Sequence, residues 1–241
     1  AAGSSDSADA RLNGASIYVA DTARLSTLSE ATTITLDGGA DLILKGDIVA
    51  GGQTGASGVT WLGQGDASVE LIAGQRILVD TAVSASKAVN LTTTATPGPG
   101  DDGVSVTVTT AGGLTAAGRT SDGSGGGVNV DVVGHIEAAG ALLAGGVVRQ
   151  TFDDNGNLTD ETVTWSDEDA TLSLKAGGQL WLGAMTTATD GSVVEIGGTF
   201  RANQTITLEG GSGRVHEGTN DGIGVRMPGG ARVATANPDS D

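Results

Sequence analysis

The side chains with the clearest chemical potential form one acidic cluster near the middle of the chain. Six oxygen-bearing residues lie within nine positions: Asp153, Asp154, Asn155, Asn157, Asp160 and Glu161. Carboxylate and amide oxygens are the hard ligands that Ca²⁺ prefers. Asp153, Asn155 and Asn157 have the spacing of the first three ligands of a helix–loop–helix calcium loop. That likeness then fails, because Leu158 stands where the loop needs Gly and Thr164 where it needs a bidentate Glu. The cluster is a Ca²⁺ candidate on its ligand types alone.

A plain hairpin explains the same residues. Asn155-Gly156 stands between two strand-like arms, and this dipeptide is the strongest short hairpin signal. We therefore expect a hairpin excursion over residues 147–165, with its carboxylates either solvated or binding Ca²⁺. A second acidic pair, Asp101-Asp102, falls in the Pro/Gly-rich loop 95–103, which is the weaker Ca²⁺ candidate.

Signatures of catalysis are missing from the sequence. It contains no Gly-x-Ser-x-Gly elbow, no phosphate-binding loop ending in Gly-Lys-Ser/Thr and no His-Glu-x-x-His. The two histidines, His135 and His216, are far apart in the chain, and His216 is expected at a solvated coil position. The glycine cluster Gly123–Gly127 is followed by no predicted helix whose N-terminus could bind a phosphate, so we interpret it as a corner. The sequence predicts a protein that is not an enzyme, with no certain cofactor.

Composition excludes several classes of partner. Among the 241 residues, Asp and Glu outnumber Lys and Arg by 29 to 12, for a net charge of −17. Nucleic-acid binding depends on Lys and Arg that neutralise phosphates, so a nucleic-acid partner is not expected. No apolar run approaches the roughly 18 residues of a membrane helix, so no transmembrane segment is expected. Cys is absent, which excludes disulfides and thiolate metal sites.

The chain repeats a unit of strand, small-residue corner and strand. The fullest copies are residues 34–44, 69–79 and 172–182, and their corners are rich in Ala and Gly. A longer internal repeat relates Val59-Thr-Trp61 to Val163-Thr-Trp165. Apolar residues alternate with period two and no helical stripe is present, so the chain is predicted to be all-β. Six aromatic residues are too few to fill a sandwich core, which favours a parallel β-helix (β-solenoid) over a tandem of β-sandwiches.

This interpretation divides the chain into three parts. Residues 1–13 are an N-terminal linker or partial cap, residues 14–226 are the solenoid, and residues 227–241 are a C-terminal linker or frayed end. Coils of about 20–25 residues stacked about 4.8 Å apart predict about ten coils. The apolar residues expected to point into the coil are Leu71, Ile77, Leu174, Leu180 and Ile206.

The runs 68–77 (SVELIAGQRI) and 171–180 (TLSLKAGGQL) resemble the degenerate coils of filamentous-haemagglutinin-type exoproteins. These are very large bacterial surface adhesins, and the resemblance covers most of residues 14–226. It implies a right-handed parallel β-helix. The asparagine-proline motifs of that family's secretion domain are absent, and Asn237-Pro238 alone does not make one. The resemblance therefore implies a segment of the shaft.

Three classes of function remain in view. The leading expectation is a non-catalytic structural and adhesive segment of a secreted or cell-surface bacterial fibre, located outside the cell. The alternatives are a calcium- or polysaccharide-binding solenoid module and a carbohydrate-active β-helix enzyme. The expected partners are identical copies or further coils of the same chain, stacked end to end, and host or surface glycans. End-to-end stacking is expected because the open ends of a solenoid present unpaired backbone groups.

Overall fold

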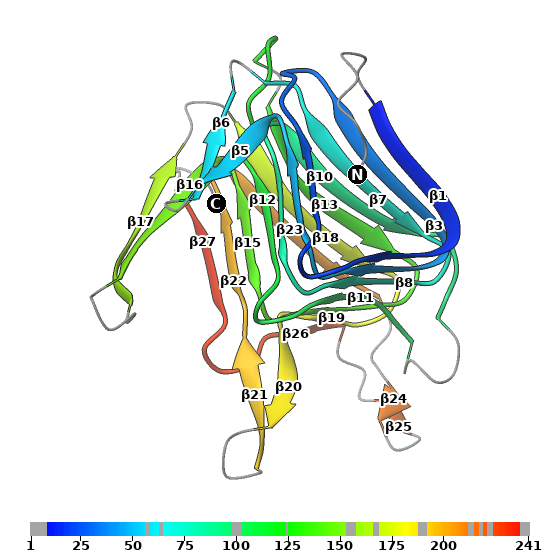
Figure 1. Cartoon of the computed structure of the whole chain (residues 1–241). Helices are drawn as coiled ribbons and strands as arrows, with labels where there is room; N and C mark the ends of the chain where they lie inside the picture. Colours follow the sequence, from blue (N-terminus) through cyan, green and yellow to red (C-terminus); the bar gives the residue numbers. More distant parts are fainter. Residues whose placement is uncertain are drawn as a thin grey trace.

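The protein is a stack of parallel β-coils in a computed structural model (Figure 1). The structure describes residues 9–55, 58–62, 65–97, 103–123, 125–152, 158–165, 169–187, 192–211, 215–216, 219–220 and 224–236. Over these residues the chain is all-β, and no helix is assigned. None of the described residues belongs to a helix that is long and apolar enough to cross a membrane.

Each coil contributes one strand to each of three faces. Face one contains the first halves of β1 (Asp9–Val19) and β3 (Thr33–Leu44), then β7 (Ser68–Ala73), β10 (Ala88–Thr93), β13 (Gly126–Val132), β18 (Ala170–Ala176) and β23 (Thr205–Gly210). Face two contains the second halves of β1 and β3, then β8 (Arg76–Val79), β11 (Val104–Val108), β14 (His135–Ala138), β19 (Leu180–Trp181) and β26 (Val225–Arg226). Face three contains β2 (Arg24–Thr27), β4 (Asp47–Ala50), β9 (Ala82–Ala85), β12 (Gly113–Ala116), β15 (Ala141–Ala144), β22 (Thr199–Ala202) and β27 (Arg232–Thr235).

Neighbouring coils pair in parallel on all three faces, which makes the fold solenoid-like. On face one, for example, Ile34 pairs with Val69, and Val69 pairs with Val89. The described residues form seven coils instead of about ten. A length of 20–25 residues was expected for every coil, whereas on face one only the steps from Asp9 to Thr33 (24 residues) and from Ser68 to Ala88 (20 residues) are that short. Other steps are longer because loops and hairpins interrupt them.

Strand pairing also extends past the expected solenoid boundaries of 14–226. At the N-terminal end, β1 already begins at Asp9 and pairs with β3. At the C-terminal end, β27 pairs with β22 through Arg232–Thr235. The parts of these strands outside 14–226, residues 9–13 and 232–235, are short, so local composition resembled that of a linker. Pairing with the neighbouring coil holds them in the ladder.

Inward side chains form continuous apolar columns along the stack. On face one, the inward column runs through Leu36, Leu71, Leu91, Val130 and Leu174, and all five are buried. On face three, a second column consists of the buried alanines Ala50, Ala85, Ala116, Ala144 and Ala202. Small side chains in that column let face three approach the other faces closely, so the core is thin and needs few aromatic residues.

The residues expected to point inward mostly do so. Leu71, Ile77, Leu174 and Leu180 are fully buried in the core. Ile206 is only partly buried, although it packs against the same core. It lies on β23, the last strand of face one, where no further coil of the described chain covers it.

Antiparallel hairpins interrupt the stack at corners between faces. They are β5 (Gly52–Gly55) with β6 (Gly58–Trp61), β16 (Gly146–Phe152) with β17 (Leu158–Trp165), β20 (Gly183–Thr187) with β21 (Val193–Gly197), and β24 (Val215–His216) with β25 (Thr219–Asn220). Figure 1 shows β16–β17 and β20–β21 projecting from the body of the stack. The antiparallel pair β16–β17 lies where Asn155-Gly156 predicted a hairpin, although residues 153–157 at its tip are outside the described residues.

The internal repeat of Val-Thr-Trp at residues 59–61 and 163–165 corresponds to two equivalent hairpins. Both leave the end of a face-three strand through a glycine with positive φ, Gly51 (72°) or Gly145 (77°). In each hairpin a glycine is paired with a tryptophan, Gly52 with Trp61 and Gly146 with Trp165. The Trp ring and a valine fill the space above that glycine, at 2.9 Å in the first hairpin and 3.2 Å in the second from where a Cβ would lie. The repeated Val-Thr-Trp therefore marks a duplicated corner hairpin.

Candidate functional site

Most of the predicted Ca²⁺ ligands cannot be placed. Asp153, Asp154, Asn155 and Asn157 lie outside the described residues, as do Asp101 and Asp102. Asp160 and Glu161 lie on β17, opposite Thr151 and Gln150. Only the backbone of these two acidic residues is described. Within the parts of the chain that the structure describes, no group of three or more His, Asp or Glu side chains could hold a metal ion. The Ca²⁺ site on the hairpin stays a prediction.

The two histidines lie on different strands of the chain. His135 is half-buried at the start of β14, and its Nδ1 accepts a hydrogen bond from the backbone N–H of Gln179 at 2.6 Å. A Cβ on Gly178 would lie 2.3 Å from this Nδ1, so the ring fits only because a glycine faces it. His135 thus links two coils. His216 lies on β24, where only the backbone is described.

The glycine cluster is a tight corner. Gly125 has φ of 75°, and a Cβ there would lie 1.9 Å from the carbonyl oxygen of Asp169 in the next coil. A Cβ on Gly127 would lie 2.0 Å from the carbonyl oxygen of Thr171. Backbones of adjacent coils approach each other here, and only glycine permits that approach.

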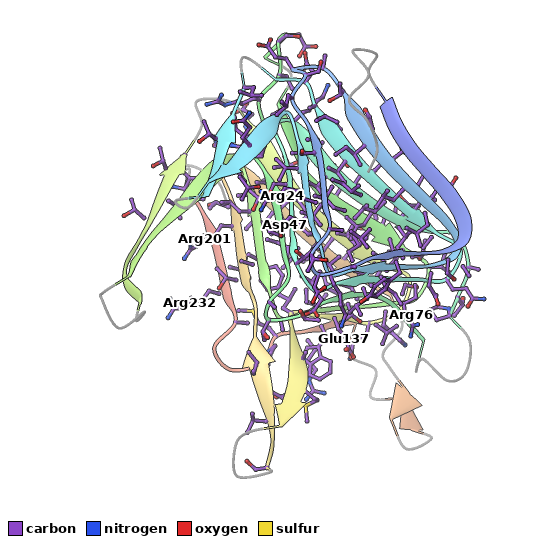
Figure 2. The ribbon with its side chains drawn as sticks, in the orientation of Figure 1. Arg24, Asp47, Arg76, Glu137, Arg201 and Arg232 are labelled. Atoms are coloured by element: carbon purple, nitrogen blue, oxygen red, sulfur yellow. The ribbon has the colours of Figure 1, made fainter. Side chains whose placement is uncertain are left out.

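Outward ion pairs connect neighbouring coils along the sides of the stack. Arg24 and Asp47 are joined on face three at 3.4 Å, and Arg76 and Asp41 on face two at 3.3 Å. Figure 2 shows Arg24 and Asp47 side by side, with Arg201 and Arg232 on the later strands of the same face. The members of these pairs keep about a quarter to half of their side-chain area exposed, so each pair contributes little to the free energy of unfolding.

A polar ladder runs along face one. The Asn90 side-chain amide donates to Glu70 Oε1 at 2.6 Å, and the Asn129 amide donates to Asn90 Oδ1 at 2.9 Å. The three residues occupy equivalent outward positions on three successive coils. Side-chain hydrogen bonds of this kind help to hold the register between coils.

One carboxylate has a clearly perturbed pKa. The Ser121 hydroxyl and the Ser121 backbone N–H, which donates to Asp66 Oδ1 at 3.1 Å, hold the pKa of Asp66 below its ordinary value. The Lys87 ammonium, 3.8 Å from Asp66 Oδ1, acts in the same direction. The three residues lie at the corner between faces three and one in separate coils, so their spacing along the sequence gave no sign of the contact.

A second cluster missed by sequence reasoning surrounds Trp181. The ring faces outward from β19 but is buried, and the Arg226 guanidinium lies 5.0 Å from its centroid. Arg226 also pairs with Glu195 on the hairpin β20–β21. The indole Nε1 of Trp181 is buried and has no hydrogen-bond partner. This cation–π contact fastens the last coil and the hairpin to the sixth coil.

A depression of about 300 Å³ lies on the edge of face one, over the fifth to seventh coils. Asp131, Lys175 and Glu209 line it and occupy one outward column in register. Lys175 Nζ lies 3.5 Å from a carboxylate oxygen of Glu209. The depression thus combines two carboxylates with one ammonium, a set that can hydrogen-bond the hydroxyl groups of a sugar.

The chain matches no family model, no curated protein and no solved structure.

Proposed function

We propose that this chain is a non-catalytic structural and adhesive segment of a bacterial surface fibre, of the filamentous-haemagglutinin-like kind. The supporting observation is the parallel stack itself. Seven coils extend the same three ladders in one direction, with one continuous apolar core. A fold that grows coil by coil along an axis suits a spacer that holds a binding region away from the cell.

The sides of the stack fit this role. Outward positions carry ion pairs and amide ladders that join adjacent coils and remain in contact with solvent. The net charge of −17 makes the sides of separate molecules repel one another. Backbone ladders along the three faces supply the cohesion of the stack.

The winding of the coils is part of the same proposal. We expect it to be right-handed, because connections between parallel strands of one sheet are right-handed in nearly all proteins. A map that resolves the strands of consecutive coils would test the hand directly, and left-handed coils would separate this chain from the proposed family.

Adhesion is assigned to the projecting hairpins. The hairpins β5–β6 and β16–β17 leave equivalent corners, and β16 lies against β6. They interrupt the coils without supplying strands to the three faces, and this is why contact with host or surface glycans is assigned to them.

Immunogold electron microscopy of cells that produce the full-length protein tests the fibre role. Antibodies raised against the 241-residue chain should label fibres or the outer cell surface, and label confined to the cell interior would contradict the proposal. Beads coated with the chain should adhere to glycan-bearing surfaces. Beads coated with a variant whose hairpin residues 150–161 are replaced by Gly-Ser are the matched control for the adhesive part and should adhere less.

A second candidate function, polysaccharide binding, is supported by the depression lined by Asp131, Lys175 and Glu209. Calorimetry with a panel of neutral and acidic polysaccharides would detect it, and Lys175→Met should abolish the heat of binding. An assay for new reducing ends or unsaturated products in the same mixtures tests the carbohydrate-active enzyme. Product formation that Lys175→Met or Glu209→Gln removes would overturn the non-catalytic proposal.

A further inference from the structure

The depression on face one lies where side chains along one edge of the sheet become smaller from coil to coil. Two series of residues show this over the fifth, sixth and seventh coils: the inward residues at the strand ends, Val132, Ala176 and Gly210, and the corner residues that follow them, Val133, Gly177 and Gly211. Both series change from valine to glycine. The floor of the depression over the sixth and seventh coils is therefore largely backbone.

The two corner glycines are required by the stacking of the coils. A Cβ on Gly177 would lie 2.3 Å from the carbonyl oxygen of Val133, and a Cβ on Gly211 would lie 2.1 Å from the carbonyl oxygen of Gly177. Neither position accepts a side chain without moving the backbone of the neighbouring coil. The depression, of about 300 Å³, is thus a consequence of how these coils pack.

Three charged side chains line the depression in one outward column. Asp131, Lys175 and Glu209 are paired in register on β13, β18 and β23, neighbouring strands of face one (Figure 1). Lys175 has a carboxylate on either side, but its Nζ lies 3.5 Å from Glu209. Among the described residues, no cation lies within ion-pair distance of Asp131. Asp131 therefore presents an exposed carboxylate to the depression.

The charge of the depression restricts the sugars that it can accept. Two carboxylates and one ammonium leave an excess of one negative charge, on a chain whose net charge is −17. Acidic sugars are repelled both by the depression and by the whole chain. A protonated amine is attracted by both, and it can donate a charge-assisted hydrogen bond to a carboxylate.

We infer that the depression binds an amino-sugar unit of a polysaccharide, with the protonated amine of the sugar on the carboxylate of Asp131. Lys175 can donate to a hydroxyl group of the same sugar, and Glu209 can accept from another. A volume of about 300 Å³ is at the small end of ligand sites, which suits a single sugar unit. This inference rests on the second candidate function, polysaccharide binding, and names the class of sugar.

Calorimetric titration at about pH 6, where the amine of the sugar is protonated, tests the inference with two ligands that differ only in that amine. Glucosamine oligomers should bind to the natural chain. The same oligomers with every amine acetylated should bind roughly fivefold more weakly, because they lose an exposed ion pair. This difference should shrink as salt rises, since salt screens the pair.

Two single substitutions locate the contact. Asp131→Asn should remove the preference for the free amine, so that both oligomers bind equally weakly. Asp37→Asn is the matched control and should keep the preference, because Asp37 occupies the same outward column three coils away. Both variants should keep the wild-type circular dichroism spectrum. In the natural chain, the amide NMR signals of Gly177 and Gly211 should shift when the glucosamine oligomer is added.

Several outcomes would overturn the inference. Equal losses of affinity in Asp131→Asn and Asp37→Asn would show that the whole acidic chain attracts the cationic oligomer. Unchanged signals of Gly177 and Gly211 would place the sugar elsewhere. Equal affinity of the natural chain for the two oligomers would reject the amine contact while leaving polysaccharide binding in place. Absence of binding to every saccharide would reject the second candidate function itself, and the inference with it.

Discussion

An inward position in a middle coil accepts only an apolar side chain. Leu174 lies on face one between Val130 of the coil before and Leu208 of the coil after, and it is fully buried. Its neighbours on the same strand, Ser173 and Lys175, point outward and contact solvent. Alternation of this kind means that adjacent residues have opposite tolerance to charge.

Replacing Leu174 with Asp should lower the free energy of unfolding by several kcal/mol, because it places an unpaired carboxylate in the core. Urea denaturation followed by circular dichroism would measure the loss. Ser173→Asp is the matched control and should cost less than about 1 kcal/mol, since its side chain faces solvent. Wild-type stability in Leu174→Asp would mean that the strand does not have this orientation.

Asp66 links folding to pH. Its pKa is lowered in the folded state by Ser121 and Lys87, so the folded protein favours the charged carboxylate. A lowered folded pKa gives stability that is present above the unfolded pKa, near 3.8, and is lost as the pH falls through the folded value.

Asp66→Asn should therefore be less stable than the natural chain at about pH 6, and this difference should shrink or vanish at about pH 2.5. Urea titrations at a series of pH values would give the difference. Ser121→Ala keeps the backbone donor and should lose only part of the same pH-dependent stability. A difference between Asp66→Asn and wild type that stays constant with pH would contradict the assigned contacts.

At the scale of elements, the strands of the coils and the strands of the hairpins differ in what they pair with. Coil strands form parallel ladders on three faces, while β16 and β17 pair only with each other. The four pairs nearest the stack, from Gly146 with Trp165 to Arg149 with Thr162, are enough to close the corner.

Replacing residues 150–161 by Gly-Ser should leave the β spectrum and the melting temperature close to those of the natural chain, because the deleted part adds nothing to the core. Deleting residues 170–181, an equal number that belong to β18 and β19, should prevent folding. Calorimetry with Ca²⁺ completes the comparison: heat of binding in the natural chain should disappear when 150–161 are replaced. The absence of any heat in the natural chain would exclude a Ca²⁺ site on this hairpin.

The whole molecule behaves as a one-dimensional array. The coil made of β7, β8 and β9 is followed directly by an equivalent coil, since Ser68 pairs with Ala88, and Leu71 with Leu91. The coils on its two sides therefore have strands that could pair with each other in the same register if this coil were removed.

Deleting residues 68–87 should remove one coil and leave a folded, shorter stack, because Ile34 would then pair with Val89 in place of Val69. The melting temperature should fall modestly, and the circular dichroism per residue should be unchanged. Deleting residues 68–77 removes half a coil, shifts the ladder by one face and should prevent folding. Equal loss of structure in both deletions would mean that the coils are not modular.

The sequence alone determined the class of fold. Alternating apolar residues, Ala- and Gly-rich corners and the scarcity of aromatic residues predict stacked β-coils, and that periodicity is local, so it can be counted along the chain. Leu71, Ile77, Leu174 and Leu180 were assigned to the core on the same basis, and all four are buried. The Asn-Gly signal placed a hairpin at the right corner because a turn depends on few residues.

Only the tertiary structure decided the number of coils, the limits of the stack and the contacts between coils. Coil length depends on how many residues leave the stack at each corner, and β5–β6 has neither an Asn-Gly nor an Asp-Gly pair between its strands. Asp66 meets Ser121, and Trp181 meets Arg226, only because parallel register brings distant segments side by side.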